Sequence, residues 1–162
     1  MNVPKSYKFE VLSNPLSREF HRVVRRSLFK QSWFSYSSRA IANTNPPFSE
    51  GRINMFSLKL GEEIVGTIAL EKVRGKSNTA AATLVAIKEE YQGQGLGKLL
   101  LSETKKWAIH NAINTIVVNA APEAKAFYNK SGFVEKLWND AAPLTNVEIV
   151  NDTSIEMYCS LS

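Results

Sequence analysis

Three glycines at alternate positions, Gly93, Gly95 and Gly97, stand between a strand-like apolar run and a helix-like run. The strand-like run covers residues 83–87, and the helix-like run begins at Lys98. Glycines leave their backbone N–H groups unshielded by side chains, and a helix N-terminus adds the positive end of its dipole. This arrangement predicts a site for a phosphate or a pyrophosphate group.

Two familiar phosphate-binding motifs do not match these residues. A P-loop requires a glycine where this chain has Gln92 and a hydroxyl where it has Leu99, so no side chain here could hold magnesium. A dinucleotide fingerprint requires Gly-x-Gly-x-x-Gly in an early strand-turn-helix unit. The spacing here is Gly-x-Gly-x-Gly, and it lies past the middle of the chain.

A third pattern does match. Gln92-x-x-Gly95-x-Gly97 resembles the pyrophosphate-binding motif of the GNAT superfamily, the acyl-CoA-dependent N-acyltransferases. A second block, Ala-x-x-Phe-Tyr-x-x-x-Gly-Phe over residues 124–133, resembles a later motif of the same family. The two blocks stand in the family's order, with a predicted helix and strand between them. The resemblance is strongest over residues 84–133.

Hydrophobic periodicity and turn residues predict the elements that must position these motifs. Strands are expected at residues 7–11, 53–60, 64–73, 79–87, 115–119, 133–137 and 154–160. Helices are expected at residues 16–28, 98–112 and from Pro122 to Gly132, with a short helix or a loop at 32–45. Tight turns favour an antiparallel meander, whereas the strand at 115–119 must cross over to return beside the previous one. The expected class is α/β (α+β): a mixed, mostly antiparallel, twisted sheet of six to seven strands with about four flanking helices, similar to the GNAT fold.

Length and composition indicate one domain over residues 1–162, with 44% hydrophobic residues for its core. No apolar run approaches the ~20 residues of a membrane span, and the first residues lack the apolar block of a secretory signal. A single cysteine, Cys159, excludes an internal disulfide and suits a reducing compartment, so we expect a cytoplasmic protein. With two histidines and this one cysteine, no metal site is expected.

The net charge of +5 has a local origin in the predicted first helix. Its basic residues are Arg18, Arg22, Arg25, Arg26 and Lys30. A solvated helix face explains them, and an anionic cofactor would also favour a basic neighbourhood. Nucleic-acid binding rests on this helix alone, and we do not expect it.

The resemblance implies where a coenzyme A molecule would bind. The parallel strands at 79–87 and 115–119 would splay apart, and the pantetheine arm would enter the gap between them. Backbone groups of Val85, Ala86 and Ile87 would contact the pantetheine and the acyl carbonyl. The pyrophosphate would be held by the loop residues Gln92, Gly93, Gln94, Gly95, Leu96, Gly97 and Lys98.

Aminolysis of a thioester needs a neutral amine, a stabilised oxyanion and a protonated leaving thiolate, and no protein nucleophile. By resemblance, Tyr128 is the candidate general acid, because the matching tyrosine lies near the cofactor sulfur. Glu71, late in a central strand, is a candidate general base, although a water relay would serve as well. Asn119 is not assigned to the cofactor, since the family's asparagine aligns with Ala121.

The function expected is transfer of an acetyl group from acetyl-CoA to a primary amine by direct attack. The alternative is a non-catalytic CoA-binding module of the same fold, with a regulatory or interaction role. The acceptor is not identified, because its expected recognition segments, 32–51 and 138–152, carry the weakest patterns. A homodimer is possible by resemblance, and no membrane partner is expected.

Overall fold

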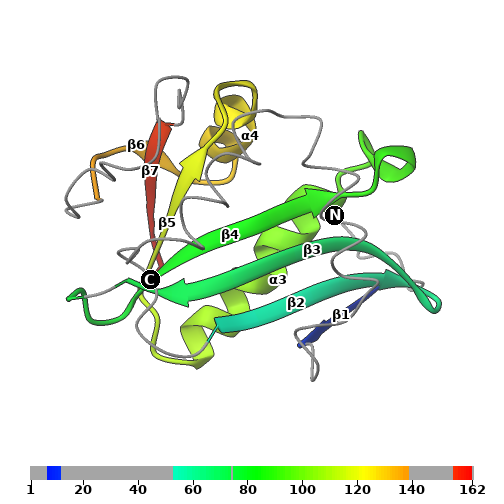
Figure 1. The fold of residues 1–162 in the computed structure, drawn as a ribbon, viewed down its shortest axis with the longest axis horizontal. Helices are drawn as coiled ribbons and strands as arrows, with labels where there is room; N and C mark the ends of the chain where they lie inside the picture. The colour runs from blue at the N-terminus through cyan, green and yellow to red at the C-terminus, as the bar shows by residue number, and fades with distance from the viewer. Residues whose placement is uncertain (1–6, 12–52, 74, 139–154, 162) are drawn as a thin grey trace, which may run out of the picture.

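A seven-stranded mixed sheet is the centre of the part of the chain that the computed structural model describes, residues 7–11, 53–73, 75–138 and 155–161 (Figure 1). The strands are β1 (Tyr7–Val11), β2 (Ile53–Leu60), β3 (Glu63–Lys72), β4 (Thr79–Ile87), β5 (Thr115–Ala120), β6 (Val134–Glu135) and β7 (Ile155–Ser160). They lie in the order β1-β2-β3-β4-β5-β7-β6, and only the β4–β5 pair among them is parallel. The predicted α+β class and mostly antiparallel sheet are therefore confirmed.

Helices in the described residues are fewer than expected. They are α3 (Leu96–His110) and α4 (Lys125–Lys130), together with the 3-10 turns η1 (Glu89–Tyr91) and η2 (Pro122–Ala124). The predicted helix at 16–28 and the segment at 32–45 lie outside the described residues. The helix predicted from Pro122 is a 3-10 turn followed by the short α4, so about four flanking helices become two here.

Helix α3 begins and ends two residues earlier than the sequence predicted. Gly95 has a left-handed backbone with φ +80° and forms the N-cap, so the helix begins at Leu96. At the other end Ala112 also has a positive φ of +62°, and the Ile113 N–H donates back to the Ala108 carbonyl at 2.9 Å. A left-handed residue cannot continue an α-helix, and this ends α3 at His110.

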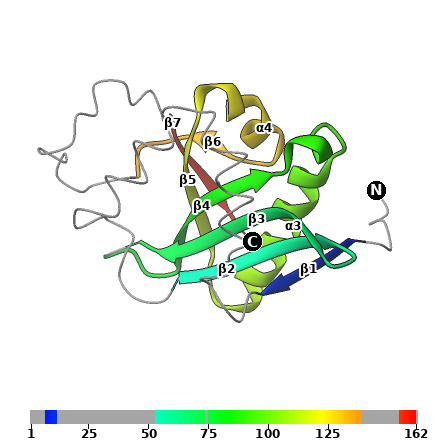
Figure 2. The ribbon, with the colours of Figure 1, turned by 45° about the vertical axis from the view of Figure 1, so that its right-hand side comes forward.

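The two faces of the sheet are covered differently (Figure 2). Helix α3 packs on one face, where its Leu100 and Leu101 join buried strand residues such as Phe56 and Ile68 in the main core. Trp138 lies on the other face in a smaller cluster with Ala81 and Val117. Strand residues therefore alternate between an α3 face and a Trp138 face.

Candidate active site

Strands β4 and β5 begin as neighbours and then part. Their parallel ladder runs from the Thr79–Thr115 pair to the Ala82–Val118 pair, although β4 continues to Ile87. Figure 1 shows the two arrows diverging toward their carboxyl ends. Beyond Ala82, the β5-facing edge of β4 has no strand partner among the described residues.

A β-bulge lies on β4 where this divergence begins. Thr67 pairs with Ala86 and Ala69 pairs with Thr83, so two residues of β4, at 84 and 85, oppose one residue of β3. A bulge disrupts the local ladder and turns backbone groups out of register. The bulge therefore lies just beyond the end of the β5 ladder, between the Thr83 and Ala86 pairs. Of the predicted backbone contacts, Val85 and Ala86 lie there, and Ile87 follows them at the end of β4.

The glycine loop joins the carboxyl end of β4, through η1, to the N-terminus of α3. The first helical hydrogen bond runs from the Leu99 N–H to the Gly95 carbonyl at 3.1 Å, so the amides of residues 96–98 precede the helix ladder. No side chain of the described residues caps this end, and no acidic residue stands in its first turn. Because no described group caps or neutralises the positive dipole end, this end of α3 suits an anion.

The loop glycines are needed for two different reasons. Gly93 and Gly95 have backbone φ angles of +81° and +80°, which residues other than glycine rarely adopt. Gly97 has no such backbone, but an added Cβ would lie 3.2 Å from Cε1 and 3.3 Å from Cζ of the Phe127 ring. The glycine loop and the Phe-Tyr block, far apart in the sequence, therefore touch at Gly97.

This contact gives a prediction for the Gly97→Ala variant. The added methyl group must displace the Phe127 ring by a few tenths of an ångström, an overpacking cost of about 2 kcal/mol. Alanine gains about 1 kcal/mol over glycine within a helix, so we expect the free energy of unfolding to fall by a net amount of about 1 kcal/mol. Urea denaturation measures it. Ser102→Ala, on the exposed side of α3, is the matched control and should not destabilise the protein. A Gly97→Ala, Phe127→Leu double variant should recover stability, and failure to do so would contradict the contact.

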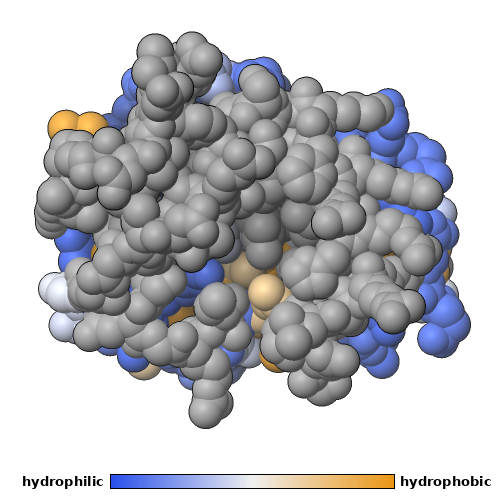
Figure 3. Space-filling view, viewed as in Figure 1, coloured by the Kyte–Doolittle hydropathy of each residue, from blue (hydrophilic) through white to orange (hydrophobic). Residues whose placement is uncertain are grey.

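Gln92 has a different role in the structure from that of a simple phosphate ligand. Its side-chain amide donates to the Ile87 carbonyl at 2.9 Å, and its backbone N–H donates to the Glu89 carbonyl at 3.2 Å. These two hydrogen bonds connect the start of the glycine loop to the end of β4 and to η1. Lys98 is exposed beside the loop. In Figure 3 the coloured atoms along the right-hand edge, the side toward which β4 points in Figure 1, are mostly hydrophilic.

Glu71 is a buried carboxyl group on the Trp138 face of the sheet. It pairs across the strands with Ala81, one residue before the β4–β5 ladder ends. Its side chain is 7% exposed, and Oε2 has no hydrogen-bond partner among the described residues. Burial disfavours the charged form and raises the pKa of Glu71 to about 7 from the ordinary 4.5. A carboxyl group with this pKa can accept a proton near neutral pH.

Two further hydroxyl groups on this side of the sheet have buried oxygens with no partner among the described residues. They belong to Thr83, opposite Ala69 on β3, and to Ser57 on β2. Thr83 is diagonal to Glu71 across the β3–β4 pair. Unpaired buried polar atoms are costly, so these positions suit a polar ligand or ordered water. Neither residue was predicted from the sequence, where no local pattern marks a buried hydroxyl group.

Tyr128 lies on α4 within the main core. Its side chain is 5% exposed and stacks edge-on against Phe127 at 5.1 Å and Phe133 at 5.3 Å between ring centroids. Burial raises the pKa of the phenol above its ordinary value of 10.0, so the hydroxyl keeps its proton at neutral pH. Its hydroxyl makes no hydrogen bond with the described residues, and it remains free to donate.

Trp138 is the residue whose place the sequence did not indicate. Its indole N–H donates to the carbonyl of Val118 at 3.1 Å, the β5 residue at which the parallel ladder ends. Its backbone N–H donates to Glu156 at 3.0 Å, and its carbonyl accepts from Lys76 at 2.8 Å. Trp138 is 3% exposed, and these hydrogen bonds hold its ring beside the point where β4 and β5 separate.

Four further polar residues near these elements take no part in the arrangement described above. Glu89 and Glu90 are exposed in η1, Asn119 pairs with Glu156 on β7, and Cys159 is a buried β7 residue packed in the main core. Most of the expected acceptor segments, at 32–51 and 139–152, lies outside the described residues. The described residues contain no group of three metal-ligating side chains and no helix long and apolar enough to cross a membrane.

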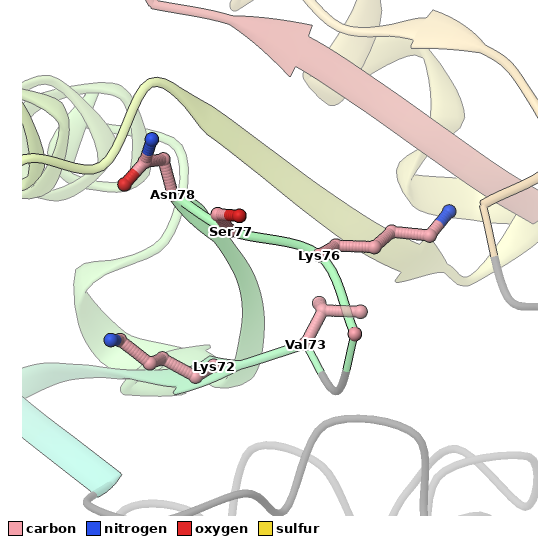
Figure 4. A pocket seen from close by; sticks show the side chains of 6 residues that line it. Lys72, Val73, Lys76, Ser77 and Asn78 are labelled. Carbon is pink, nitrogen blue, oxygen red and sulfur yellow. The ribbon is translucent and has the colours of Figure 1, made fainter.

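A pocket of about 420 Å³ lies at the β3–β4 turn, at the opposite end of β4 from the glycine loop (Figure 4). Lys72 and Lys76 leave this turn in opposite directions, and Lys76 is already bonded to the Trp138 carbonyl. The turn precedes Thr79 at the start of β4, whereas the glycine loop follows the end of that strand. This pocket is therefore not part of the candidate site.

The family model described as an acetyltransferase (GNAT) domain matches residues 27–141, which is more than half of the chain. The chain therefore belongs to the GNAT acetyltransferase family. A protein of Gracilaria tenuistipitata var. liui, named an uncharacterized N-acetyltransferase ycf52, is 42% identical over 50 residues. That alignment spans 31% of this chain and only 28% of the relative.

Solved structures are similar over nearly the whole chain. A GNAT-family acetyltransferase of Staphylococcus aureus Mu50 has a TM-score of 0.67 and 17% identity, with 96% of this chain and 99% of that chain covered. The PaiA N-acetyltransferase of Thermoplasma acidophilum, solved in complex with coenzyme A, has a TM-score of 0.66 and 18% identity, with the same coverage. At these identities, the likeness shows a shared fold.

Proposed function

We propose that this protein is an acetyl-CoA-dependent N-acetyltransferase that acetylates a primary amine by direct attack. One observation carries the proposal. The uncapped N-terminus of α3, with its glycine loop, follows β4 directly after that strand has left β5. An anion site and an unpaired strand edge thus lie along one strand, as a cofactor with a diphosphate and an extended arm requires.

The backbone of this chain would hold the cofactor. Backbone amides within residues 92–98 would bind the diphosphate with the α3 dipole, and backbone groups of Val85, Ala86 and Ile87 would contact the pantetheine. Bound acetyl-CoA supplies an activated acyl group as a thioester. Both positive-φ glycines and the absence of acidic residues from the first turn of α3 fit an anionic ligand here.

Glu71 and Tyr128 would move the protons. Glu71, with a pKa of about 7, takes a proton from the attacking amine as the new N–C bond forms. Tyr128 gives its proton to the departing sulfur as the C–S bond breaks. Tyr128 belongs to the α3-face core and Glu71 lies on the Trp138 face, so the two groups would reach the thioester from opposite faces of the sheet. Such a separation suits an incoming base and a leaving-group acid.

The test is release of free thiol from acetyl-CoA with a panel of small amines and peptides, corrected for hydrolysis without acceptor. The proposal expects amine-dependent thiol release together with the acetylated product by mass spectrometry. Tight CoA binding with no release for any acceptor would favour the non-catalytic CoA-binding module instead. A cytoplasmic location and a homodimer remain predictions.

A further inference from the structure

The carboxylate of Glu63, the first residue of β3, joins the β2–β3 hairpin to the segment that precedes the glycine loop. Its Oε2 lies 2.5 Å from the Lys88 ammonium nitrogen, and its Oε1 accepts a hydrogen bond from the Tyr91 hydroxyl at 3.0 Å. The Lys88 backbone N–H also donates to the Val65 carbonyl at 2.8 Å. Three bonds therefore attach residues 88–91 to β3.

This attachment fixes the point from which the loop departs. Tyr91 is followed directly by Gln92, whose side chain and backbone bond back to Ile87 and Glu89. Two sets of bonds thus hold the start of the loop: those of Glu63 to Lys88 and Tyr91, and those of Gln92 to residues 87 and 89. The Lys88 side chain is 14% exposed and the Glu63 side chain 40% exposed, so water reaches the ion pair from the Glu63 side.

The charge state of Glu63 agrees with this geometry. The Lys88 ammonium, and after it the Tyr91 hydroxyl, hold the pKa of the Glu63 carboxyl below its usual range. The carboxylate is therefore charged at neutral pH and accepts both bonds at once. An ion pair of this exposure contributes little to global stability, so its consequence should be local order of the loop.

We infer that Glu63 is a positioning residue for the diphosphate-binding loop and acts on the cofactor through Lys88 and Tyr91. The inference rests on the proposed function, because it requires coenzyme A to bind at residues 92–98. A loop held in its binding conformation loses less conformational entropy when the ligand arrives. Glu63 therefore affects affinity for the diphosphate end of the cofactor, while the reacting groups stay as they are.

Calorimetric titration of the Glu63→Gln variant with coenzyme A tests the inference. The dissociation constant should rise about three- to tenfold, as expected from a lost charge-assisted bond that organises a loop. Competition with pantetheine, which lacks the diphosphate, should show the same affinity as in the wild type. Glu62→Gln, an exposed neighbour in the same turn, is the matched control and should bind coenzyme A normally.

A double-mutant cycle separates positioning from a direct ligand role for Lys88. If Glu63 and Lys88 act as one unit, Glu63→Gln combined with Lys88→Met should bind coenzyme A no more weakly than the worse single variant. Tyr91→Phe, a milder change, should give a smaller loss in the same direction. Under an acetylation assay, KM for acetyl-CoA should rise while kcat stays within about twofold.

Three results would overturn the inference: unchanged coenzyme A affinity in Glu63→Gln, equal losses for pantetheine and coenzyme A, or additive losses in the cycle. Equal losses would mean that Glu63 supports the fold in general. A wild-type protein that binds no coenzyme A would instead reject the proposed function, so the two failures are distinguishable.

Discussion

Glu71→Gln should lower kcat/KM for the amine about a hundredfold, because the variant has no base to accept the amine proton. The wild-type profile should rise with pH through about 7, where the buried carboxyl group ionises. The variant should lose that rise. The measurement is the pH profile of thiol release in both proteins, with Glu90→Gln, an exposed residue near the loop, as the control.

The same variant should be more stable than the wild type at high pH. The pKa of Glu71 is raised in the folded state from 4.5 to about 7, so folding favours its protonated form. Its contribution to stability is therefore complete below about pH 4.5 and is lost as pH rises through 7. We expect Glu71→Gln to gain roughly 2 kcal/mol over the wild type at pH 8 and little at pH 4.5. Urea denaturation at both pH values would show it, and equal stabilities at pH 8 would contradict the burial argument.

Tyr128→Phe should lower kcat about 10- to 100-fold, since the leaving thiolate would have no adjacent acid. Affinity for coenzyme A should change little, because the ring and its contacts with Phe127 and Phe133 remain. Stability should also be retained, since the hydroxyl makes no hydrogen bond with the described residues. Steady-state kinetics with acetyl-CoA, together with a calorimetric titration, measure both effects.

Tyr7→Phe is the matched control for that experiment. Tyr7 lies on β1, the edge strand at the opposite side of the sheet from α4, so the loss of its hydroxyl should leave kcat unchanged. A normal kcat in Tyr128→Phe would remove Tyr128 as the general acid. A large loss of stability in that variant would instead mean that the hydroxyl supports the core.

Apolar runs bounded by turn residues were sufficient to place the central strands. The bounds of β2 and β4 agree with the predicted ranges 53–60 and 79–87, because tight turns with glycine or asparagine limit both. The last strands were less predictable. The strand expected at 133–137 is only Val134–Glu135. Beyond it the Lys136 N–H still donates to the Glu156 carbonyl of β7, but the Trp138 side chain bonds to Val118 of β5. Such a contact between residues 20 positions apart leaves no local pattern.

Part of the candidate site could likewise be predicted from the sequence, and part could not. Its backbone part was predictable, because glycine spacing and the following helix are local features of residues 92–98. The environment of Glu71 was not predictable, because its burial depends on pairing with Ala81 and on what covers that face of the sheet. The Glu63–Lys88 pair was also missed, since the two residues meet only after β3 and β4 have paired.

The central claim is that backbone amides at residues 92–98 bind the diphosphate of coenzyme A. Calorimetric titration of the folded protein with coenzyme A tests it most directly, with Gly95→Val as the variant that places a β-branched residue at a left-handed backbone position. The account predicts saturable, one-to-one binding by the wild type and at least about tenfold weaker binding by Gly95→Val, given the strain at that position. Absence of heat from a wild-type sample whose fold is verified by circular dichroism, or equal affinity in the variant, would contradict it.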